Sequence, residues 1–241
     1  MFLFNFNKSR SLVRVDIHSH LLPNIDDGAK NLEESIFLIQ ELKKLGYSKL
    51  IITPHINSIY SNSESDIFNK FSFLQEELIK REIKIDIDLG AEYCIDDNFI
   101  ELLYKKKEFL SFGKNKYLLF EFPHHIEPLV DIDNFIYELH LNGYTPVLAH
   151  PERYVYWYNS LDKFIELKEM DILFQLNLNS LNGYYGLGAK LCSKWLIKKS
   201  YIDFVGSDTH HITSILNLKK VLNSSIYKSI FNNNNILNNN F

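Results

Sequence analysis

The sequence LEESIFLIQELKKLGYSKLIIT occupies residues 32–53 and combines two patterns that decide the fold class. Ile36, Ile39, Leu42 and Leu45 recur on one side of a helix that is expected to end at Gly46, since glycine commonly ends a helix. Leu50–Thr53 is a short run that is apolar on both faces, which is typical of a parallel strand covered by helices. The stretch therefore predicts a helix followed by a buried strand.

The same alternation extends over most of the chain. Further helices are expected at 65–81, 131–142, 161–170, 188–199 and 214–222. Counting 50–53, seven strands are expected: 13–17, 50–53, 85–91, 117–122, 145–149, 172–176 and 202–205. Alternating strands and helices indicate βαβ units in an α/β fold. Seven repeats in one domain favour a barrel, and an open doubly wound sheet is the alternative.

The composition indicates one domain in a chain of 241 residues. We expect residues 1–12 to form a flexible arm, 13–231 the domain, and the asparagine-rich end, 232–241, a disordered tail. A net charge of -4 argues against nucleic-acid binding. Two cysteines and no run of about 18 apolar residues favour a reducing compartment without membrane insertion, so a cytoplasmic protein is expected.

Six of the seven expected strands deliver a possible metal ligand at or just beyond their carboxyl end. In a barrel of parallel strands, these ends meet at one rim, where catalytic residues gather. Imidazoles and carboxylates in this number exceed what a single tetrahedral zinc requires, so two or three ions could be bound. The donors suit manganese, iron or zinc without distinguishing among them. The nine candidates are His18, His20, Asp27, His55, Glu92, Glu121, His150, Asp208 and His210.

The charge of such a centre favours phosphate. Three divalent ions and the four candidate carboxylates would leave a net charge of about +2, which attracts a phosphate dianion and can acidify a bound water. Arg153 follows His150 closely and could clamp phosphate oxygens, or it could form a surface ion pair. A cysteine phosphatase is excluded because Cys-x5-Arg is absent: Ile100 stands six residues after Cys94. The glycine-rich stretch 183–188 is expected to be a turn before a helix.

Several motifs together resemble the PHP superfamily (polymerase and histidinol phosphatase). The resemblance is strongest to the bacterial manganese-dependent protein-tyrosine phosphatases of capsule and exopolysaccharide loci, the CpsB/CapC type. It covers roughly residues 13–222. The motifs are Asp16-Ile17-His18-Ser19-His20, Ile25-Asp26-Asp27-Gly28-Ala29-Lys30, Thr53-Pro54-His55, Ala91-Glu92-Tyr93, Ala149-His150-Pro151-Glu152-Arg153 and Ser207-Asp208-Thr209-His210.

This resemblance implies a distorted seven-stranded (β/α) barrel with a three-ion Mn²⁺ centre, Fe or Zn being the alternatives. One ion would lie among His18, His20, Glu92 and Asp208. Glu92 would bridge to a second ion held with Glu121 and His150, and the third would be held by Asp27, His55 and His210. Arg153 would bind phosphate, and Arg153, Asp208 and His55 are expected to be essential for turnover by a metal-activated water.

The resemblance also implies a substrate, the tyrosine-phosphorylated tail of a membrane-associated bacterial tyrosine kinase that controls polysaccharide synthesis. A second arginine found after the Asp-x-His motif in several members is absent here, so His211 could assist Arg153. Tyr154 could stack on the substrate ring, although packing over the rim is the favoured interpretation for each aromatic residue in this stretch. His124 and His125 match no ligand of the family and are expected to be loop residues.

Two other functions and the oligomeric state remain open from the sequence. A histidinol-phosphatase-like or other small-molecule phosphomonoesterase would keep the fold and the chemistry and change the substrate. A non-catalytic protein that docks on a kinase would use metal ions for structure alone. The native metal and whether the chain forms a homo-oligomer are not indicated by any motif.

Overall fold

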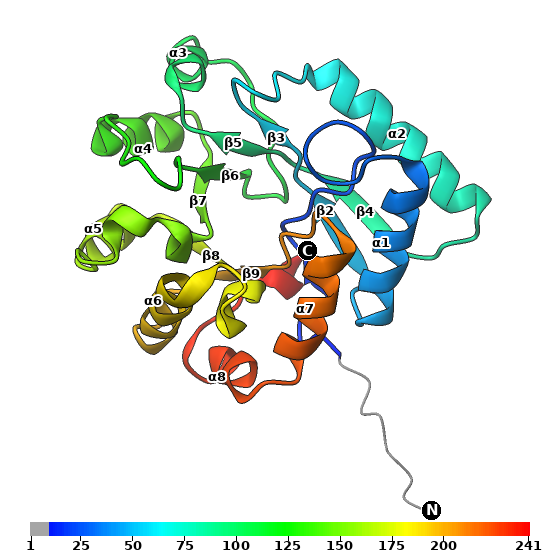
Figure 1. Cartoon of the computed structure of the whole chain (residues 1–241). Helices are drawn as coiled ribbons and strands as arrows, with labels where there is room; N and C mark the ends of the chain where they lie inside the picture. The colour runs from blue at the N-terminus through cyan, green and yellow to red at the C-terminus, as the bar shows by residue number, and fades with distance from the viewer. Residues whose placement is uncertain (1–9) are drawn as a thin grey trace, which may run out of the picture.

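The computed structural model describes residues 10–241, which form an α/β fold with parallel sheets (Figure 1). Most of the expected N-terminal arm, residues 1–9, lies outside the described residues. Of the remainder, Leu12 is anchored because its backbone N–H donates to the Tyr227 hydroxyl at 2.8 Å. The fold class predicted from the alternating patterns is confirmed.

Over residues 10–241, nine strands form two sheets, and all strand pairs within them are parallel. The three-stranded sheet has the order β1-β2-β4, and the six-stranded sheet has the order β3-β5-β6-β7-β8-β9. The strands are β1 (Val15–Asp16), β2 (Lys49–Ile52), β3 (His55–Ile56), β4 (Asp86–Leu89), β5 (Glu92–Cys94), β6 (Tyr117–Glu121), β7 (Thr145–Ala149), β8 (Leu173–Asn177) and β9 (Phe204–Gly206).

The prediction of a seven-stranded barrel is not confirmed, because β3 and β5 lie outside the expected ranges and the nine strands of the described residues divide between two sheets. β2 and β3 are separated at Thr53-Pro54, where proline has no N–H to donate to a ladder. β4 and β5 are separated at Gly90-Ala91. At the other end of the arrangement, residues just beyond β1 and β9 meet, since Asp208 N–H donates to the His18 carbonyl at 2.9 Å.

Eight α-helices are present among the described residues. Six match the expected helices within a few residues: α1 (Leu32–Lys44), α2 (Glu64–Lys80), α4 (Ile132–Leu141), α5 (Lys163–Glu169), α6 (Gly186–Lys198) and α7 (Ile212–Leu222). Two were not expected, α3 (Asp97–Tyr104) and α8 (Ser225–Asn233). Short 3-10 helices follow β7 and β8, at Pro151–Arg153, Val155–Trp157 and Leu178–Asn182.

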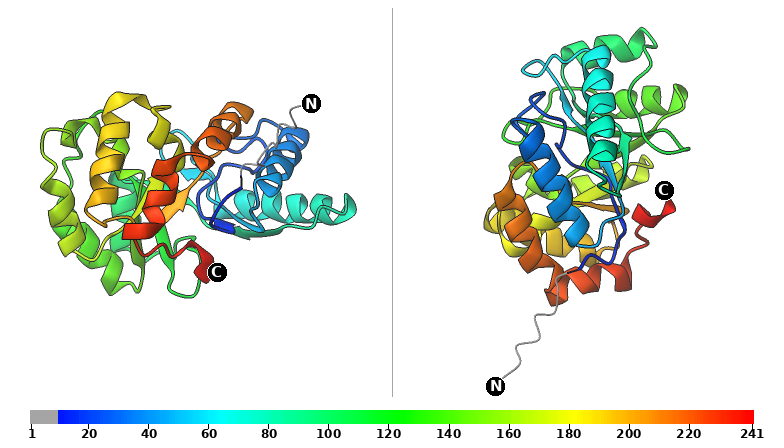
Figure 2. Two further views of the ribbon diagram at one scale, coloured as in Figure 1. Left: turned by 90° about the horizontal axis from the view of Figure 1, so that it is seen from below. Right: turned by 90° about the vertical axis from the view of Figure 1, so that its right-hand side faces the viewer.

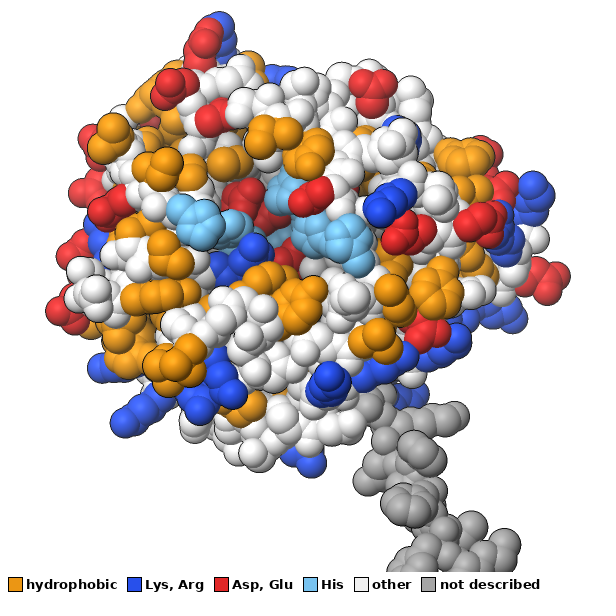
Figure 3. All heavy atoms as spheres, in the orientation of Figure 1, with side chains coloured by type: hydrophobic (Ala, Val, Ile, Leu, Met, Phe, Trp, Pro, Cys, Tyr) orange, Lys and Arg blue, Asp and Glu red, His pale blue; other side chains and the backbone are white. Residues whose placement is uncertain are grey.

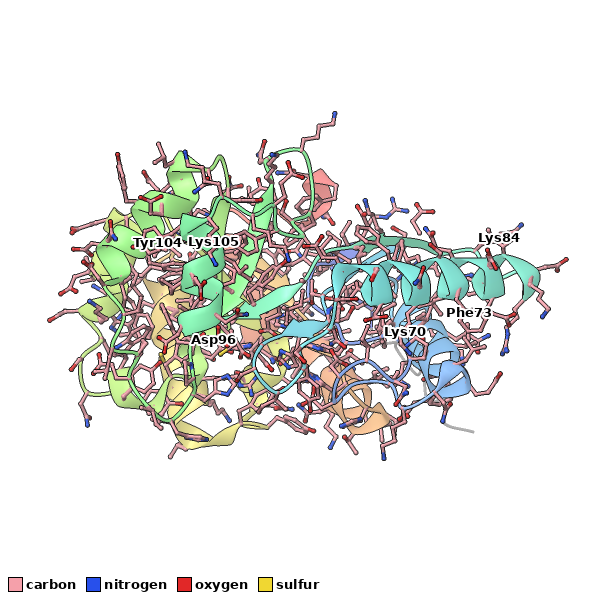
Figure 4. The ribbon with its side chains drawn as sticks, turned by 90° about the horizontal axis from the view of Figure 1, so that it is seen from above. Lys70, Phe73, Lys84, Asp96, Tyr104 and Lys105 are labelled. Carbon is pink, nitrogen blue, oxygen red and sulfur yellow. The ribbon has the colours of Figure 1, made fainter. Side chains whose placement is uncertain are left out.

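The helices cover the outside of the strands and leave their carboxyl ends accessible. In Figures 1 and 2, α1 and α2 flank the three-stranded sheet, and α3 to α6 follow one another around the six-stranded sheet. Figure 4 shows Lys70 and Phe73 on α2 well apart from Tyr104 at the end of α3. The caps are local: the side chain of Asp96 accepts a hydrogen bond from Phe99 N at 2.8 Å and begins α3.

The asparagine-rich end is ordered, which corrects the expectation of a disordered tail from residue 232. Asn238 is fully buried. Its side-chain nitrogen donates to the carbonyls of Val15 and Val205, and its side-chain oxygen accepts from Val205 N at 2.9 Å. An asparagine amide offers both donors and an acceptor, so this side chain connects β1 to β9 where no ladder joins them. Composition predicted the opposite because it ignores these bonds.

Two other expectations concern the whole chain. Cys94 and Cys192 are both free thiols. Within residues 10–241, no helix has the length and apolar character needed to cross a membrane.

Candidate metal centre

The nine side chains predicted as ligands converge on one pocket at the carboxyl ends of the strands. The pocket has a volume of about 290 Å³, and Figure 3 shows histidine side chains with neighbouring acidic groups around a hollow in the surface. Its lining includes Asp27, His55, Glu92, Glu121, His150, Asp208 and His210, together with Arg153 and His124. His18 and His20 lie fully buried beneath it.

In the deepest part of the site, two imidazole nitrogens each lie within 3.4 Å of two carboxylate oxygens. The Nε2 atoms of His18 and His20 are 3.2 Å apart. Glu92 Oε2 lies 3.2 Å from the first and 3.3 Å from the second. Asp208 Oδ1 lies 3.4 Å from both. Two imidazole nitrogens and two carboxylate oxygens therefore face a common point.

Neighbouring acceptors fix the tautomers of the two imidazoles. Gln175 Oε1 lies 2.7 Å from His18 Nδ1 and also accepts from the His150 backbone N–H, so His18 Nδ1 must donate. Asp26 Oδ2 lies 2.8 Å from His20 Nδ1, and since a carboxylate oxygen only accepts, His20 Nδ1 must donate as well. In a neutral imidazole, the other nitrogen then carries a lone pair. Such orienting partners typically stand behind metal-binding histidines.

Two further groups extend the site outward. His150 Nε2 lies 2.9 Å from Glu92 Oε1 and 3.7 Å from Glu121 Oε2. His55 uses both ring nitrogens, with Nδ1 3.1 Å from Glu92 Oε2 and Nε2 3.5 Å from Asp27 Oδ1. His210 Nε2 lies 3.4 Å from the same Asp27 oxygen. The donors thus form overlapping groups that share residues, as the three-ion arrangement requires.

Burial and charge set the protonation of the two glutamates. Burial, and then the negative charge of Glu92, raise the pKa of Glu121 well above its usual range. Burial opposes ionisation of Glu92 as well, but His18 and His55 outweigh it and hold the pKa of Glu92 well below its usual range. Burial and then Arg153 lower the pKa of His150 to about 4. Without metal, one carboxylate is therefore ionised and its neighbour is neutral.

Backbone conformation also serves the site. His150 and Asp208 have φ values of 34° and 48°, in the left-handed region that residues with a side chain seldom occupy. Such conformations cost free energy and cluster at functional sites. Gly28 is required for a different reason, since a Cβ atom there would come within 2.1 Å of the His20 carbonyl oxygen. The acidic turn that carries Asp27 packs closely on the His20 backbone as a result.

Arg153 is held at the edge of the pocket by two neighbours, which Asn177 in turn contacts. Its Nη1 donates to Asp208 Oδ2 at 3.0 Å, and its guanidinium lies 4.3 Å from the centre of the Tyr185 ring. Asn177 donates to the same Asp208 oxygen at 2.7 Å and to the Tyr185 hydroxyl at 3.1 Å. The structure places Arg153 beside Asp208, and its stacking on Tyr185 supplies an orientation that spacing alone did not indicate.

The residues predicted to contact substrate do not all reach the pocket. Tyr154 is fully buried, and its hydroxyl donates to the Ala149 carbonyl and accepts from Phe122 N. The prediction that Tyr154 contacts substrate is therefore corrected, and the alternative of rim packing holds for this ring. His211 is half-buried at the start of α7 and does not line the pocket. His125 is exposed, whereas His124 turns inward.

Sequence reasoning did not assign the partners that orient the ligands. Asp26 belongs to the sequence motif at 25–30 but was not predicted to have a role of its own. Gln175 lies inside β8, and Tyr185 lies in the glycine-rich stretch at the start of α6. Proximity to Asp27 was a usable signal for Asp26. No sequence signal identified the other two, because each meets its partner only in the folded chain.

The donor set fits divalent metal ions. The Nε2 atoms of His18 and His20 lie 3.2 Å apart, and each is within 3.4 Å of one oxygen of Glu92 and one of Asp208. Glu92 Oε2 and His55 Nδ1 are buried without a hydrogen-bond partner. Buried polar atoms normally have partners, so such a cluster is stable only when a cation or shared protons lie among the donors. Nitrogen and oxygen donors without thiolate are compatible with manganese, iron or zinc.

Comparison with known proteins identifies relatives along nearly the whole chain. The CpsB/CapC family of capsular polysaccharide synthesis matches residues 14–231. The chain is 32% identical to CapC of Staphylococcus aureus over 219 residues, covering 90% of this chain and 85% of CapC. It is 34% identical to the tyrosine-protein phosphatase YwqE of Bacillus subtilis over 199 residues, covering 82% and 78% of the two chains.

A solved structure gives the same result. It comes from work on YwqE of Bacillus subtilis and CpsB of Streptococcus pneumoniae, described as unique metal-dependent tyrosine phosphatases. The TM-score is 0.78 at 31% sequence identity, and the match covers 94% of both chains. The relatives therefore share the fold over the region that carries the metal centre.

Proposed function

The chain belongs to the CpsB/CapC family of capsular polysaccharide synthesis proteins, and we propose that it hydrolyses phosphotyrosine in proteins with bound metal ions. The observation that carries this proposal is that the Nε2 atoms of His18 and His20 each lie within 3.4 Å of one oxygen of Glu92 and one of Asp208, with both imidazoles fixed by acceptors behind them. Its relatives YwqE and CpsB bear the name tyrosine-protein phosphatase.

The residues present divide into three roles. The nine predicted ligands hold the ions, with Glu92 shared between groups, and Mn²⁺ is the ion we expect. When bound, divalent ions supply Lewis-acid stabilisation of phosphoryl charge and lower the pKa of water. Arg153 offers five N–H donors in a planar fork at the edge of the pocket and positions the phosphoryl oxygens. Tyr185 supports the guanidinium from one face.

The surface around the pocket favours a peptide over a small polar ester. Asn57 and His124 line the pocket, and two residues beyond each lies an exposed apolar side chain. These are Ile59, 80% exposed, and Ile126, 74% exposed. Apolar side chains that follow pocket-lining residues this closely in sequence offer contacts for residues that flank a phosphotyrosine. The tyrosine-phosphorylated tail of a kinase that acts in polysaccharide synthesis fits this description and the family.

The test is hydrolysis of an aryl phosphate and of a phosphotyrosine peptide by the purified protein. EDTA should abolish both reactions, and Mn²⁺ should restore them. His55→Ala or Asp208→Ala should lower turnover by orders of magnitude, whereas His125→Ala, at an exposed position, should not. Near-normal turnover in both ligand variants would contradict the assignment.

Substrate class is tested separately. A phosphotyrosine peptide should be hydrolysed with a much higher kcat/KM than histidinol phosphate. The reverse order would favour a small-molecule phosphomonoesterase. Binding to a tyrosine kinase without hydrolysis under any metal would instead favour a non-catalytic docking protein.

A further inference from the structure

His124, in the loop that follows β6, is a histidine for which the nine-ligand set leaves no role. Its Nε2 atom is buried and has no hydrogen-bond partner. That atom lies 3.5 Å from Glu121 Oε2. The ring centre is 5.0 Å from that of His150. The side chain therefore turns toward the metal centre, although the loop itself lies at the surface.

The orientation of His124 is fixed by its surroundings. Its backbone carbonyl accepts a hydrogen bond from Val155 N at 3.4 Å. Its ring packs against Tyr154, with ring centres 5.9 Å apart, and Tyr154 is itself held through its hydroxyl by Phe122 and Ala149. An imidazole confined in this way is preorganised, because little side-chain freedom is left to lose when it binds a ligand.

Glu121, His124 and His150 together offer one carboxylate oxygen and two imidazole nitrogens, with these atoms all within 4.8 Å of one another. The Glu121 carboxylate lies 3.5 Å from His124 Nε2 and 3.7 Å from His150 Nε2, both too long for hydrogen bonds. Ligands about 2.1 Å from one ion are separated by roughly 3.0–3.4 Å at octahedral or tetrahedral angles. The spacing suits donors around an ion better than direct bonds between them.

We propose that His124 is a further metal ligand that binds the same ion as Glu121 and His150. The proposal rests on the metal centre of the proposed function and adds a donor to it. The neighbouring His125 is exposed and takes no part. The ion at this end of the centre then has one more nitrogen donor than the nine residues provide.

The experiment measures metal binding directly and needs no turnover. Metal-free wild-type protein, His124→Ala, His124→Phe and the matched control His125→Ala are equilibrated at graded free Mn²⁺, and bound Mn²⁺ is counted by metal analysis and calorimetry. The two His124 variants should bind one ion roughly 10–100-fold more weakly than the wild type. Loss of a residue that only orients a metal ligand typically weakens metal binding by this factor, and loss of a ligand should weaken it at least as much. His125→Ala should bind like the wild type. With Co²⁺, absorption bands of one bound ion should change only in the His124 variants.

The phenylalanine variant keeps an aromatic ring between His150 and Tyr154, so it separates loss of the donor from loss of packing. Equal Mn²⁺ affinity and equal Co²⁺ spectra for wild type and a folded His124→Phe protein would overturn the proposal, even if KM for a phosphopeptide changed. If the wild type itself binds no divalent ion, the proposed function fails. If it binds ions that His124→Phe binds equally well, only the role of His124 fails.

Discussion

Asp26 controls the metal centre without being one of the predicted ligands. Its Oδ2 atom accepts from His20 Nδ1 at 2.8 Å and from the His55 backbone N–H at 3.1 Å, and its Oδ1 atom accepts from Gly28 N at 2.9 Å. Replacing it with asparagine keeps the shape of the side chain and leaves one acceptor oxygen instead of two. At least one of these donors then faces an NH₂ group.

The size of the effect follows from these bonds. Hydrogen bonds to a charged group contribute about 1.5–3 kcal/mol, and those between neutral groups contribute about 0.5–1.5 kcal/mol. Losing the charge behind His20 should therefore weaken metal binding by about 1–1.5 kcal/mol, and loss of the bond at Gly28 adds to this. We expect Asp26→Asn to weaken Mn²⁺ binding about 10–100-fold, as for other orienting partners.

The assay is turnover of an aryl phosphate as a function of free Mn²⁺, with calorimetry of Mn²⁺ binding to the metal-free protein. The curve for Asp26→Asn should shift to higher Mn²⁺ and approach wild-type turnover at saturation. Asp97→Asn, an exposed carboxylate in the first turn of α3, is the control and should not shift it. Unchanged Mn²⁺ affinity in a folded Asp26→Asn protein would refute the role given to the His20 tautomer.

The remaining predictions concern Arg153, the C-terminal end and a buried acid. Tyr185→Ala should raise KM for a phosphopeptide about as Arg153→Ala does, whereas Tyr185→Phe, which keeps the stacked ring, should raise it less; steady-state kinetics decide this. Asn238→Ala should lower the free energy of unfolding by about 2–4 kcal/mol, because the buried backbone groups of Val15 and Val205 lose their hydrogen-bond partner. Urea denaturation measures this difference, and Asn240→Ala, at an exposed position, is the control that should leave stability unchanged. Burial raises the pKa of Glu152 from 4.5 to about 7, so the folded state binds more protons than the unfolded state between these values and loses about 3 kcal/mol as pH rises through them. Glu152→Gln should remove this pH-dependent loss of stability. The melting temperature of the variant minus that of the wild type should therefore increase from pH 5 to pH 8, and a difference that stays constant with pH would contradict the raised pKa of Glu152.

Features that depend on chain order were predictable from the sequence. Eight of the nine ligand candidates lie within a few residues of a strand end, with Asp27 in the turn between β1 and α1 as the exception, and parallel strands bring these ends together. Six helices were predictable because their apolar residues recur at helical spacing in the expected ranges. α3 follows the strand β5 after two residues and was not expected, and α8 was obscured by the asparagines at its end.

Features that depend on partners distant in sequence were not predictable. Gln175 orients His18 from within β8, and nothing in the apolar strand pattern marks that residue. Tyr154 follows the phosphate-binding motif, but spacing does not show whether its ring points inward or outward. Asn238 belongs to a segment whose composition is typical of disorder, yet three hydrogen bonds bury it. In each case the deciding contact joins residues that only the fold brings together.

The charges around the pocket explain why phosphate binding and metal binding must depend on each other. Arg153 is the one lysine or arginine among the described residues that line the pocket, and it is already paired with Asp208. Glu121 is neutral, and the ionised Asp27, Glu92 and Asp208 outnumber this guanidinium. Beneath them, burial opposes protonation of His18 and His20, but the neighbouring carboxylates outweigh burial and raise the pKa values of both, which offsets the negative charge of the metal-free pocket. The metal-free pocket therefore offers a phosphate dianion no net positive charge. Because no second arginine follows His210, the attraction for phosphate must come from the cations that the site gathers.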